Sequence, residues 1–204
     1  MRDLDKALAD ITAMRSQMAR GTEFQGYGPV TVAATAVLAL IAGGVQALWL
    51  PDPGADVLNT IMLWVATAAV SVVLIGIEMV ARSRRIHSGL ADEMIHAATE
   101  QFIPAGVAGA LITVVLYRFA PDSLWMLPGL WQIVFSLGFF ASCRSLPRPM
   151  FAVGVWYLAT GLATLAFANG AQAFSPWAMA VPFGVGQLLM AAILYRSGAN
   201  HAEG

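Results

Sequence analysis

Six long apolar segments dominate the sequence and decide what the chain can fold into. Most of them contain about 20 residues or more, enough for a helix to cross the hydrocarbon of a bilayer. We therefore predict an all-α, polytopic integral membrane protein whose six transmembrane helices pair as three hairpins. The segments cover residues 29–50, 57–80, 102–119, 124–143, 150–169 and 176–195.

The composition agrees with a chain whose main solvent is lipid. Hydrophobic residues make up 58% of the 204 residues and charged residues only 11%, against about 25% charged in a soluble domain. The net charge of −1 also leaves no basic excess for a nucleic-acid-binding face. We therefore expect the lipid bilayer as a partner and no binding of nucleic acid.

The basic residues predict the orientation of the helices. If the spans alternate in direction, all basic residues except Arg118 fall on one side of the membrane. Loops rich in Lys and Arg stay in the cytoplasm, so both termini are predicted to be cytoplasmic. Arginine far outnumbers lysine and alanine is abundant, which suggests a bacterial plasma (inner) membrane. The residues on the basic side are Arg2, Lys6, Arg15, Arg20, Arg82, Arg84, Arg85, Arg144, Arg148 and Arg196.

Residues 1–28 are predicted to form a cytoplasmic amphipathic helix and a turn. The side chains of Leu4, Leu8, Ile11 and Met18 share one apolar stripe about 120° wide on a helix. The polar face mixes acids and bases and the stripe has no aromatic residue, unlike helices that lie on a membrane surface. We expect residues 1–20 to dock on a protein surface: the chain's own loops, a second copy, or a cytoplasmic partner. The bundle would then cover 29–196 and a polar tail 197–204.

A cluster of ionisable residues directly precedes the third span, in the stretch "ADEMIHAATEQF" (91–102). On a helix, Glu93, His96 and Glu100 lie within about 60° of one another and form one stripe. Asp92 and Glu93 suit the first turn of a helix, where the dipole favours negative charge. We therefore predict that the third helix begins near residue 89, outside the lipid, and continues to about 119.

The Glu93-x-x-His96 spacing has two interpretations. A Glu-x-x-His motif supplies neighbouring ligands in di-iron bundle proteins, and Glu78, Glu100 or His87 could complete a metal site here. The sequence has no second copy of the motif, however, and three arginines close the preceding span opposite these acids. We expect a salt-bridged stripe first, a partner-docking surface next and a metal or proton-linked site last. No cofactor other than this possible metal is predicted.

Two glutamines inside the spans, Gln132 and Gln187, are costly to bury and need partners. Hydrogen bonds that join helices are the favoured role, and contact with a polar ligand is the alternative. Each glutamine follows a Ser-x-Trp sequence and a proline, at 123–132 and 175–187, which suggests a hairpin repeat.

Three classes of function remain, and no motif names a reaction. The first is a module for partner docking, regulation or sensing that acts through its cytoplasmic face. The second is a transporter or channel for a small uncharged or apolar solute, with Gln132 and Gln187 on its path. The third is a membrane-embedded metal enzyme. No charge lies at the centre of a span, which counts against ion-coupled transport, and the missing second ligand motif counts against the enzyme. We predict the first.

Overall fold

The computed structural model describes residues 27–50, 52, 54–86, 91–143, 146–168 and 170–202, and among these it leaves out the side chains at 82–86, 91–99, 101, 171 and 199–202. The regular secondary structure of this part of the chain is all helical, without strands. Three short 3-10 helices, η1 (Pro121–Met126), η2 (Arg148–Met150) and η3 (Gly170–Phe174), precede the last three α-helices. The α-helices are α2 (Pro29–Trp49), α3 (Val57–Ile86), α4 (Ala91–Phe119), α5 (Leu127–Ser142), α6 (Phe151–Phe167) and α7 (Pro176–Ala202).

Six of these helical segments are long and apolar enough to cross a membrane. The predicted all-α class with six membrane-length helices is therefore confirmed for the described residues. α4 runs without a break from Ala91 through Pro104 to Phe119. The acidic stretch and the apolar segment that follows it thus belong to one helix.

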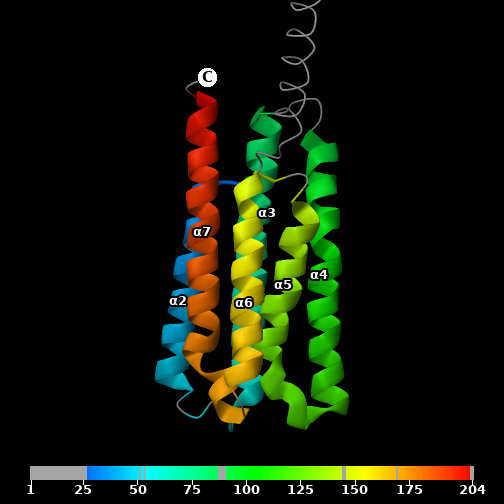
Figure 1. Cartoon of the computed structure of the whole chain (residues 1–204), viewed down its shortest axis with the longest axis vertical. Helices are drawn as coiled ribbons and strands as arrows, with labels where there is room; N and C mark the ends of the chain where they lie inside the picture. The colour runs from blue at the N-terminus through cyan, green and yellow to red at the C-terminus, as the bar shows by residue number, and fades with distance from the viewer. Residues whose placement is uncertain are drawn as a thin grey trace, which may run out of the picture.

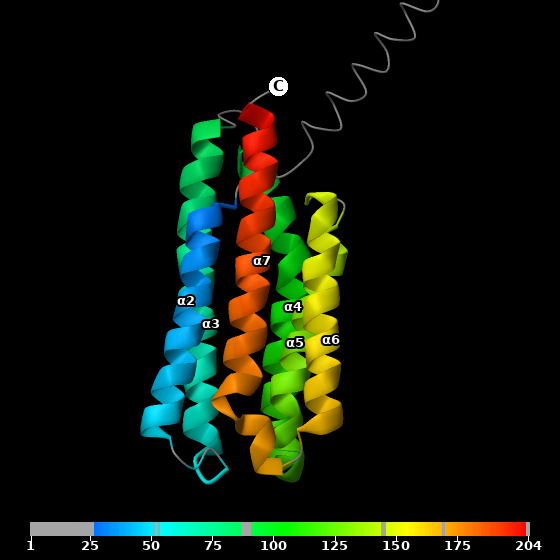
Figure 2. The same ribbon diagram turned by 60° about the vertical axis from the view of Figure 1, so that its left-hand side comes forward.

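The α-helices run side by side along one axis (Figure 1), and their contacts follow a ring in which neighbours in sequence are neighbours in space. Each helix packs on the next, and the ring closes because α7 packs along α2 (Figure 2). We call the end where α2 begins and α7 ends the proximal end, and the opposite end the distal end. α7 also touches α5 across the ring.

Local sequence explains where several helices begin. Pro29 and Pro176 open α2 and α7, the position where a helix needs no backbone N–H and the fixed φ of proline is suitable. Gly170 has a φ of 58°, a left-handed conformation that glycine adopts without steric cost. It begins η3, which turns the chain from α6 into α7.

The core is built largely from aromatic and small side chains. Near the proximal end, Tyr157 on α6 is completely buried and stacks on Phe139 of α5, with ring centroids 5.8 Å apart. Phe135 meets the Tyr157 ring edge-on at 4.9 Å. α5 and α6 approach so closely at Gly129 and Gly161 that a methyl group on either glycine would lie 2.8 Å from the carbonyl oxygen of the other. Such small residues allow membrane helices to pack backbone against backbone.

α3 and α4 contribute least to this core. Apolar side chains on both helices are largely exposed, including Val72 at 70% and Val114 at 61%. None of the residues of α4 from Phe102 to Phe119 is buried. Exposed faces of this composition suit a surrounding of lipid acyl chains.

Candidate functional site

Three polar side chains from three different helices donate hydrogen bonds to backbone carbonyls of η3 and α7. The acceptors are Phe174, Ala178 and Pro182, spaced by four residues. Ala178 and Pro182, four residues apart in α7, lie on the same face of that helix. The beginning of α7 is therefore the place where α2, α5 and α6 are joined by directional contacts.

The first donor is Gln46 of α2, which is completely buried. Its Nε2 donates to the Phe174 oxygen at 2.7 Å, and its Oε1 accepts the indole N–H of Trp64 on α3 at 2.7 Å. Both ends of this amide are paired, as burial in an apolar interior requires. The network joins α2, α3 and η3 near the distal end.

The second donor is Gln132 of α5, also completely buried. Its Nε2 donates to the Ala178 oxygen at 2.9 Å. This carbonyl would bond to the N–H of residue 182 in a regular helix, but residue 182 is a proline and has none. Gln132 therefore replaces the helical bond that Pro182 removes. Its Oε1 is buried and has no hydrogen-bond partner in the described part of the chain.

The third donor is Trp156 of α6, whose indole N–H bonds to the Pro182 oxygen at 2.9 Å. Directly after this proline, α7 contains Gly184 and Gly186, and both pack tightly. A methyl group on Gly184 would lie 3.1 Å from Leu40 of α2, and one on Gly186 would overlap the Tyr157 ring. The absence of side chains here allows α2 and α6 to approach α7.

Gln187, the residue after Gly186 on α7, lies close to Tyr157 of α6. The amide is near enough to the phenol to interact with it, yet neither the Tyr157 hydroxyl nor Gln187 Oε1 makes a hydrogen bond of good geometry with a described residue. Both residues are at least nine-tenths buried. Unpaired buried polar atoms cost free energy, so the amide orientation that pairs Gln187 with this phenol is favoured.

Glu78 of α3 lies against Gly28, the residue that precedes α2. A methyl group on Gly28 would overlap the Glu78 carboxylate, and Gly28 is the N-cap of α2. The positive end of the helix dipole favours a carboxylate there. Glu78 Oε2 is buried and accepts no hydrogen bond from the described residues. Tyr27 precedes Gly28 in the sequence, and burial raises the pKa of its phenol to about 12.

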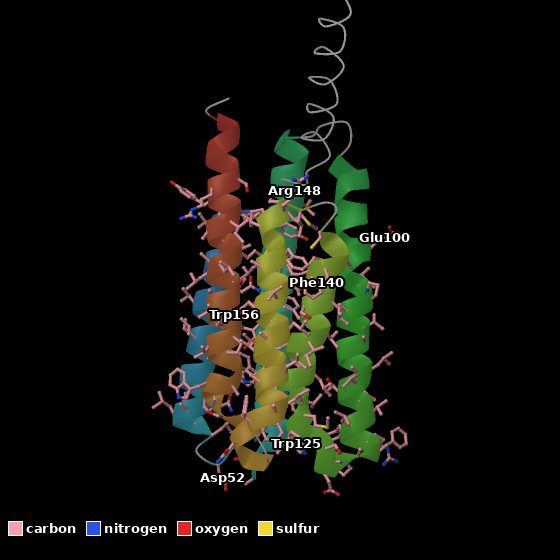
Figure 3. The ribbon with its side chains drawn as sticks, in the orientation of Figure 1. Asp52, Glu100, Trp125, Phe140, Arg148 and Trp156 are labelled. Atoms are coloured by element: carbon pink, nitrogen blue, oxygen red, sulfur yellow. The ribbon has the colours of Figure 1, made fainter. Side chains whose placement is uncertain are left out.

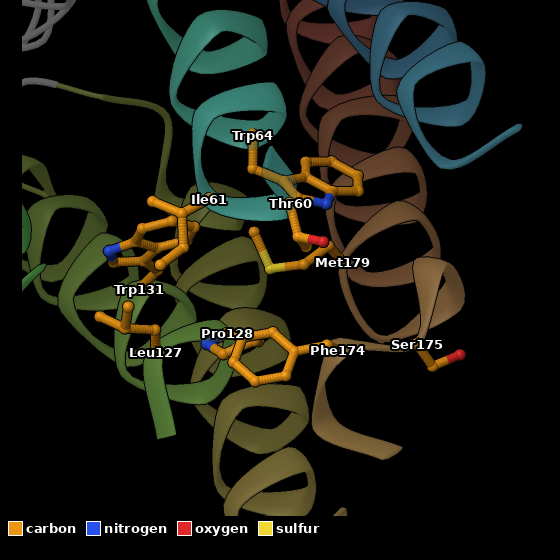
Figure 4. Close-up of a pocket in the computed structure, with 9 residues that line it drawn as sticks. All are labelled: Thr60, Ile61, Trp64, Leu127, Pro128, Trp131, Phe174, Ser175 and Met179. Atoms are coloured by element: carbon orange, nitrogen blue, oxygen red, sulfur yellow. The ribbon is translucent and has the colours of Figure 1, made fainter. Parts of the chain in front are cut away.

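A small pocket lies near the distal end, between α3, α5, η3 and α7 (Figure 4). The space inside the pocket that a water-sized molecule can enter is only about 10 Å³. This is about the space that one water needs. Thr60 contributes a buried hydroxyl with no partner among the described residues, and the remaining lining is almost entirely apolar. The pocket is too small for a metabolite. Its lining residues are Thr60, Ile61, Trp64, Leu127, Pro128, Trp131, Phe174, Ser175 and Met179.

The predicted intramembrane residues Gln132 and Gln187 are both buried, but they do not form one site. Gln132 reaches Ala178, more than two helical turns from Gln187 along α7. Gln187 instead lies beside Tyr157. The two glutamines therefore belong to separate contacts.

The predicted metal ligands lie only partly within the described residues. Glu78 contacts Gly28, whereas Glu100 is exposed on α4 (Figure 3). Glu93 and His96 are on α4, but their side chains lie outside the description. Over the described residues, no group of three or more His, Cys, Asp or Glu is placed to hold a metal. The predicted docking residues Leu4, Leu8, Ile11 and Met18 also lie outside the described part.

Sequence reasoning did not single out Trp156 or pair Gln132 with α7. The available signal was Pro182, because a proline inside a helix leaves the carbonyl four residues earlier without its donor. No family model, curated protein or solved structure matches the chain. The interpretation of these contacts therefore rests on their geometry.

Proposed function

We propose that the chain is a bacterial inner-membrane protein with six spans in three hairpins and both termini in the cytoplasm. It acts as a module for partner docking, regulation or sensing through its cytoplasmic face. The proximal end corresponds to this face, because the predicted cytoplasmic arginines belong to the segments that meet there. Arg148 is exposed near this end (Figure 3), and Arg196 is exposed toward the proximal end of α7.

Exposed aromatic residues support this placement in the bilayer. Trp177 and Tyr195 on α7 are 59% and 70% exposed and lie about 27 Å apart along the helix axis. Aromatic belts mark the two interfaces of a membrane, and the hydrocarbon between them is about 30 Å thick. Trp49 and Phe119 are likewise exposed at the distal end, where the outer belt would lie.

One observation carries the proposal: three helices are longer than a bilayer needs, and their extra length projects at the proximal end (Figures 1 and 2). α3, α4 and α7 contain 30, 29 and 27 residues. At the α-helical rise these correspond to about 45, 43 and 40 Å. Helical surface in water, grouped on one side of a membrane, is suited to binding a protein.

The contacts of Gly28 support the same role. Because Gly28 packs against Glu78 of α3, the start of α2 lies at the proximal end, beside the projecting helices. The charged residues Arg82, Glu93 and Glu100 belong to these projections. We name the projecting parts of α3, α4 and α7 the proximal platform.

The interior favours a packing role for Gln132 over a place on a solute path. Its amide N–H is committed to the Ala178 carbonyl, and the distal pocket offers the space of about one water. Transport of a small uncharged solute therefore ranks second. The metal enzyme ranks third, and it requires a stoichiometric metal that is lost when His96 is replaced by alanine.

The proposal is tested by site-specific photo-crosslinking in the cells that express the protein. A photoreactive residue is placed at Leu8, on the predicted apolar stripe, and another at Lys6, on the opposite face of the predicted helix. We expect Leu8 to crosslink to the proximal platform, to a second copy or to one defined partner, and Lys6 to crosslink at least tenfold less.

A deletion of residues 1–20 provides the second arm. The bundle should stay folded in detergent, with an unchanged circular-dichroism spectrum, while the oligomer or partner complex is lost. If Leu8 and Lys6 crosslink equally, or if the deleted chain keeps the same complexes, the docking role is wrong.

A further inference from the structure

The charged residues are divided unevenly between the two halves of the bundle. Residues 78–100, which belong to α3, α4 and the link between them, contain arginines and acids together, so these charges can neutralise one another. Residues 123–202, which include α5, α6 and α7, contain Arg144, Arg148 and Arg196 but no Asp or Glu. A negative partner for these arginines therefore comes from another part of the chain or from outside it.

The fold brings two of these arginines to the same end of neighbouring elements. Arg148 begins η2 and Arg196 lies on α7, and η2 contacts α7. Met150 and Leu194, each two residues from one of the arginines, belong to one buried apolar cluster. Both arginines are exposed, and Figure 3 shows Arg148 at the proximal end. Two cations distant in the sequence thus flank one contact between η2 and α7.

The beginning of α6 adds to the positive potential at this place. η2 leads directly into α6, which starts at the proximal end (Figure 1). Neither element has an acidic residue in its first turn or a side-chain hydrogen bond at its N-cap. The N-terminal end of a helix favours an anion and disfavours a cation. Arg148 and the helix dipole therefore both favour an anion beside them.

The surface that follows these arginines is apolar and faces outward. Phe151, only three residues after Arg148, is 57% exposed, and Val155 is exposed one turn further along α6. On α7, Leu188 is exposed two turns before Arg196. A soluble anion makes no use of these side chains, whereas a lipid places its acyl chains on them and its phosphate at the interface.

We propose that the proximal ends of α6 and α7 bind an anionic phospholipid. Its phosphate lies at Arg148 and Arg196, and its acyl chains lie along Phe151 and Leu188. Guanidinium groups donate paired hydrogen bonds to phosphate oxygens. Anionic lipids of the cytoplasmic leaflet attract basic residues next to membrane helices. The inference rests on the proposed function only for the leaflet, which is the cytoplasmic one.

The test is native mass spectrometry of the purified full-length chain in a mild detergent, without any partner. Phosphatidylglycerol and phosphatidylcholine with identical acyl chains are added in equal amounts. We expect phosphatidylglycerol binding to saturate at one molecule per chain and to survive collision energies that remove phosphatidylcholine. Equal retention of the two lipids would refute the site, and this result needs no variant.

Charge-removing variants locate the site. Arg148→Gln and Arg196→Gln should each weaken phosphatidylglycerol binding about fivefold, the usual effect of one basic residue beside an anionic lipid surface. Arg118→Gln is the matched control, because Arg118 is an exposed arginine in the last turn of α4, at the distal end. It should leave the binding unchanged. Circular dichroism checks that each variant keeps its helices, and an equal loss in all three would contradict a defined site.

Two further arms separate the lipid from other sources of negative charge. Excess glycerol phosphate, the soluble headgroup, should not displace the lipid; displacement would show a site for a soluble anion instead. Deletion of residues 1–20 should leave the preference for phosphatidylglycerol unchanged. A preference that arises only after this deletion would mean that the acids of that segment cover the arginines, and the lipid site would be wrong. Absence of a crosslink at Leu8 would contradict the docking role without affecting these results.

Discussion

Gly129 of α5 and Gly161 of α6 lie in direct backbone contact, each within reach of the other's carbonyl oxygen. Neither backbone can move aside to admit a methyl group, so overpacking at this point separates the two helices. The contact explains how the aromatic rings of α5 and Tyr157 of α6 come to stack on each other. It also provides a sharp test of the packing.

Gly129→Ala should lower the free energy of unfolding by about 1–3 kcal/mol, the usual cost of forcing extra volume into a packed core. Gly106→Ala on α4 is the matched control, since nothing lies within 4 Å of a methyl group there. That variant should be neutral or slightly more stable. Thermal or denaturant unfolding in detergent measures both, and equal effects would contradict the packing of α5 on α6.

Gln132 and Pro182 should show strong coupling in a double-mutant cycle. Gln132→Leu leaves the Ala178 carbonyl without a donor and should cost about 1 kcal/mol in a membrane protein. In a Pro182→Ala background the backbone N–H of residue 182 can bond to that carbonyl, so the same change should cost much less. Additive losses would mean that Gln132 does not replace the missing helical bond.

The fully paired amide of Gln46 should contribute more to the free energy of unfolding than the hydroxyls that bond within their own helix. Gln46→Leu orphans both the Trp64 indole and the Phe174 carbonyl, and we expect a loss of about 1–3 kcal/mol. Ser71→Ala is the control, because Ser71 only donates back to Thr67 of its own helix. A loss no larger than that of the control would show that the network is dispensable.

The raised pKa of Tyr27 predicts that the free energy of unfolding depends on pH in the alkaline range. Burial raises its pKa to about 12, against about 10 in an unfolded chain. The unfolded state therefore loses this proton first, so the contribution of Tyr27 to stability is complete below pH 10 and falls as the pH rises from about 10 to 12. Tyr27→Phe should remove this part of the decline. Unfolding curves at several alkaline pH values test it, and identical slopes in both chains would contradict it.

The sequence was sufficient to predict the six helices, because hydropathy over about 20 residues depends only on local composition. It could not reveal which donor pairs with the carbonyl freed by Pro182, since Gln132 lies 46 residues away. Glu78 similarly looked like a residue at the end of a span, and its contact with Gly28 depends on how α2 and α3 pack. The hairpin repeat and the Glu93–His96 stripe stay predictions.

The proposed function requires the proximal platform to lie in the cytoplasm and the distal end on the other side of the membrane. Single cysteines at Arg148, Arg196, Asp52 and Asp122, in a Cys143→Ser background, place both ends by labelling with a membrane-impermeant maleimide. In intact spheroplasts we predict labelling at Asp52 and Asp122 only, and labelling at Arg148 and Arg196 only after permeabilisation. Labelling of the two arginine positions in intact spheroplasts would contradict the account.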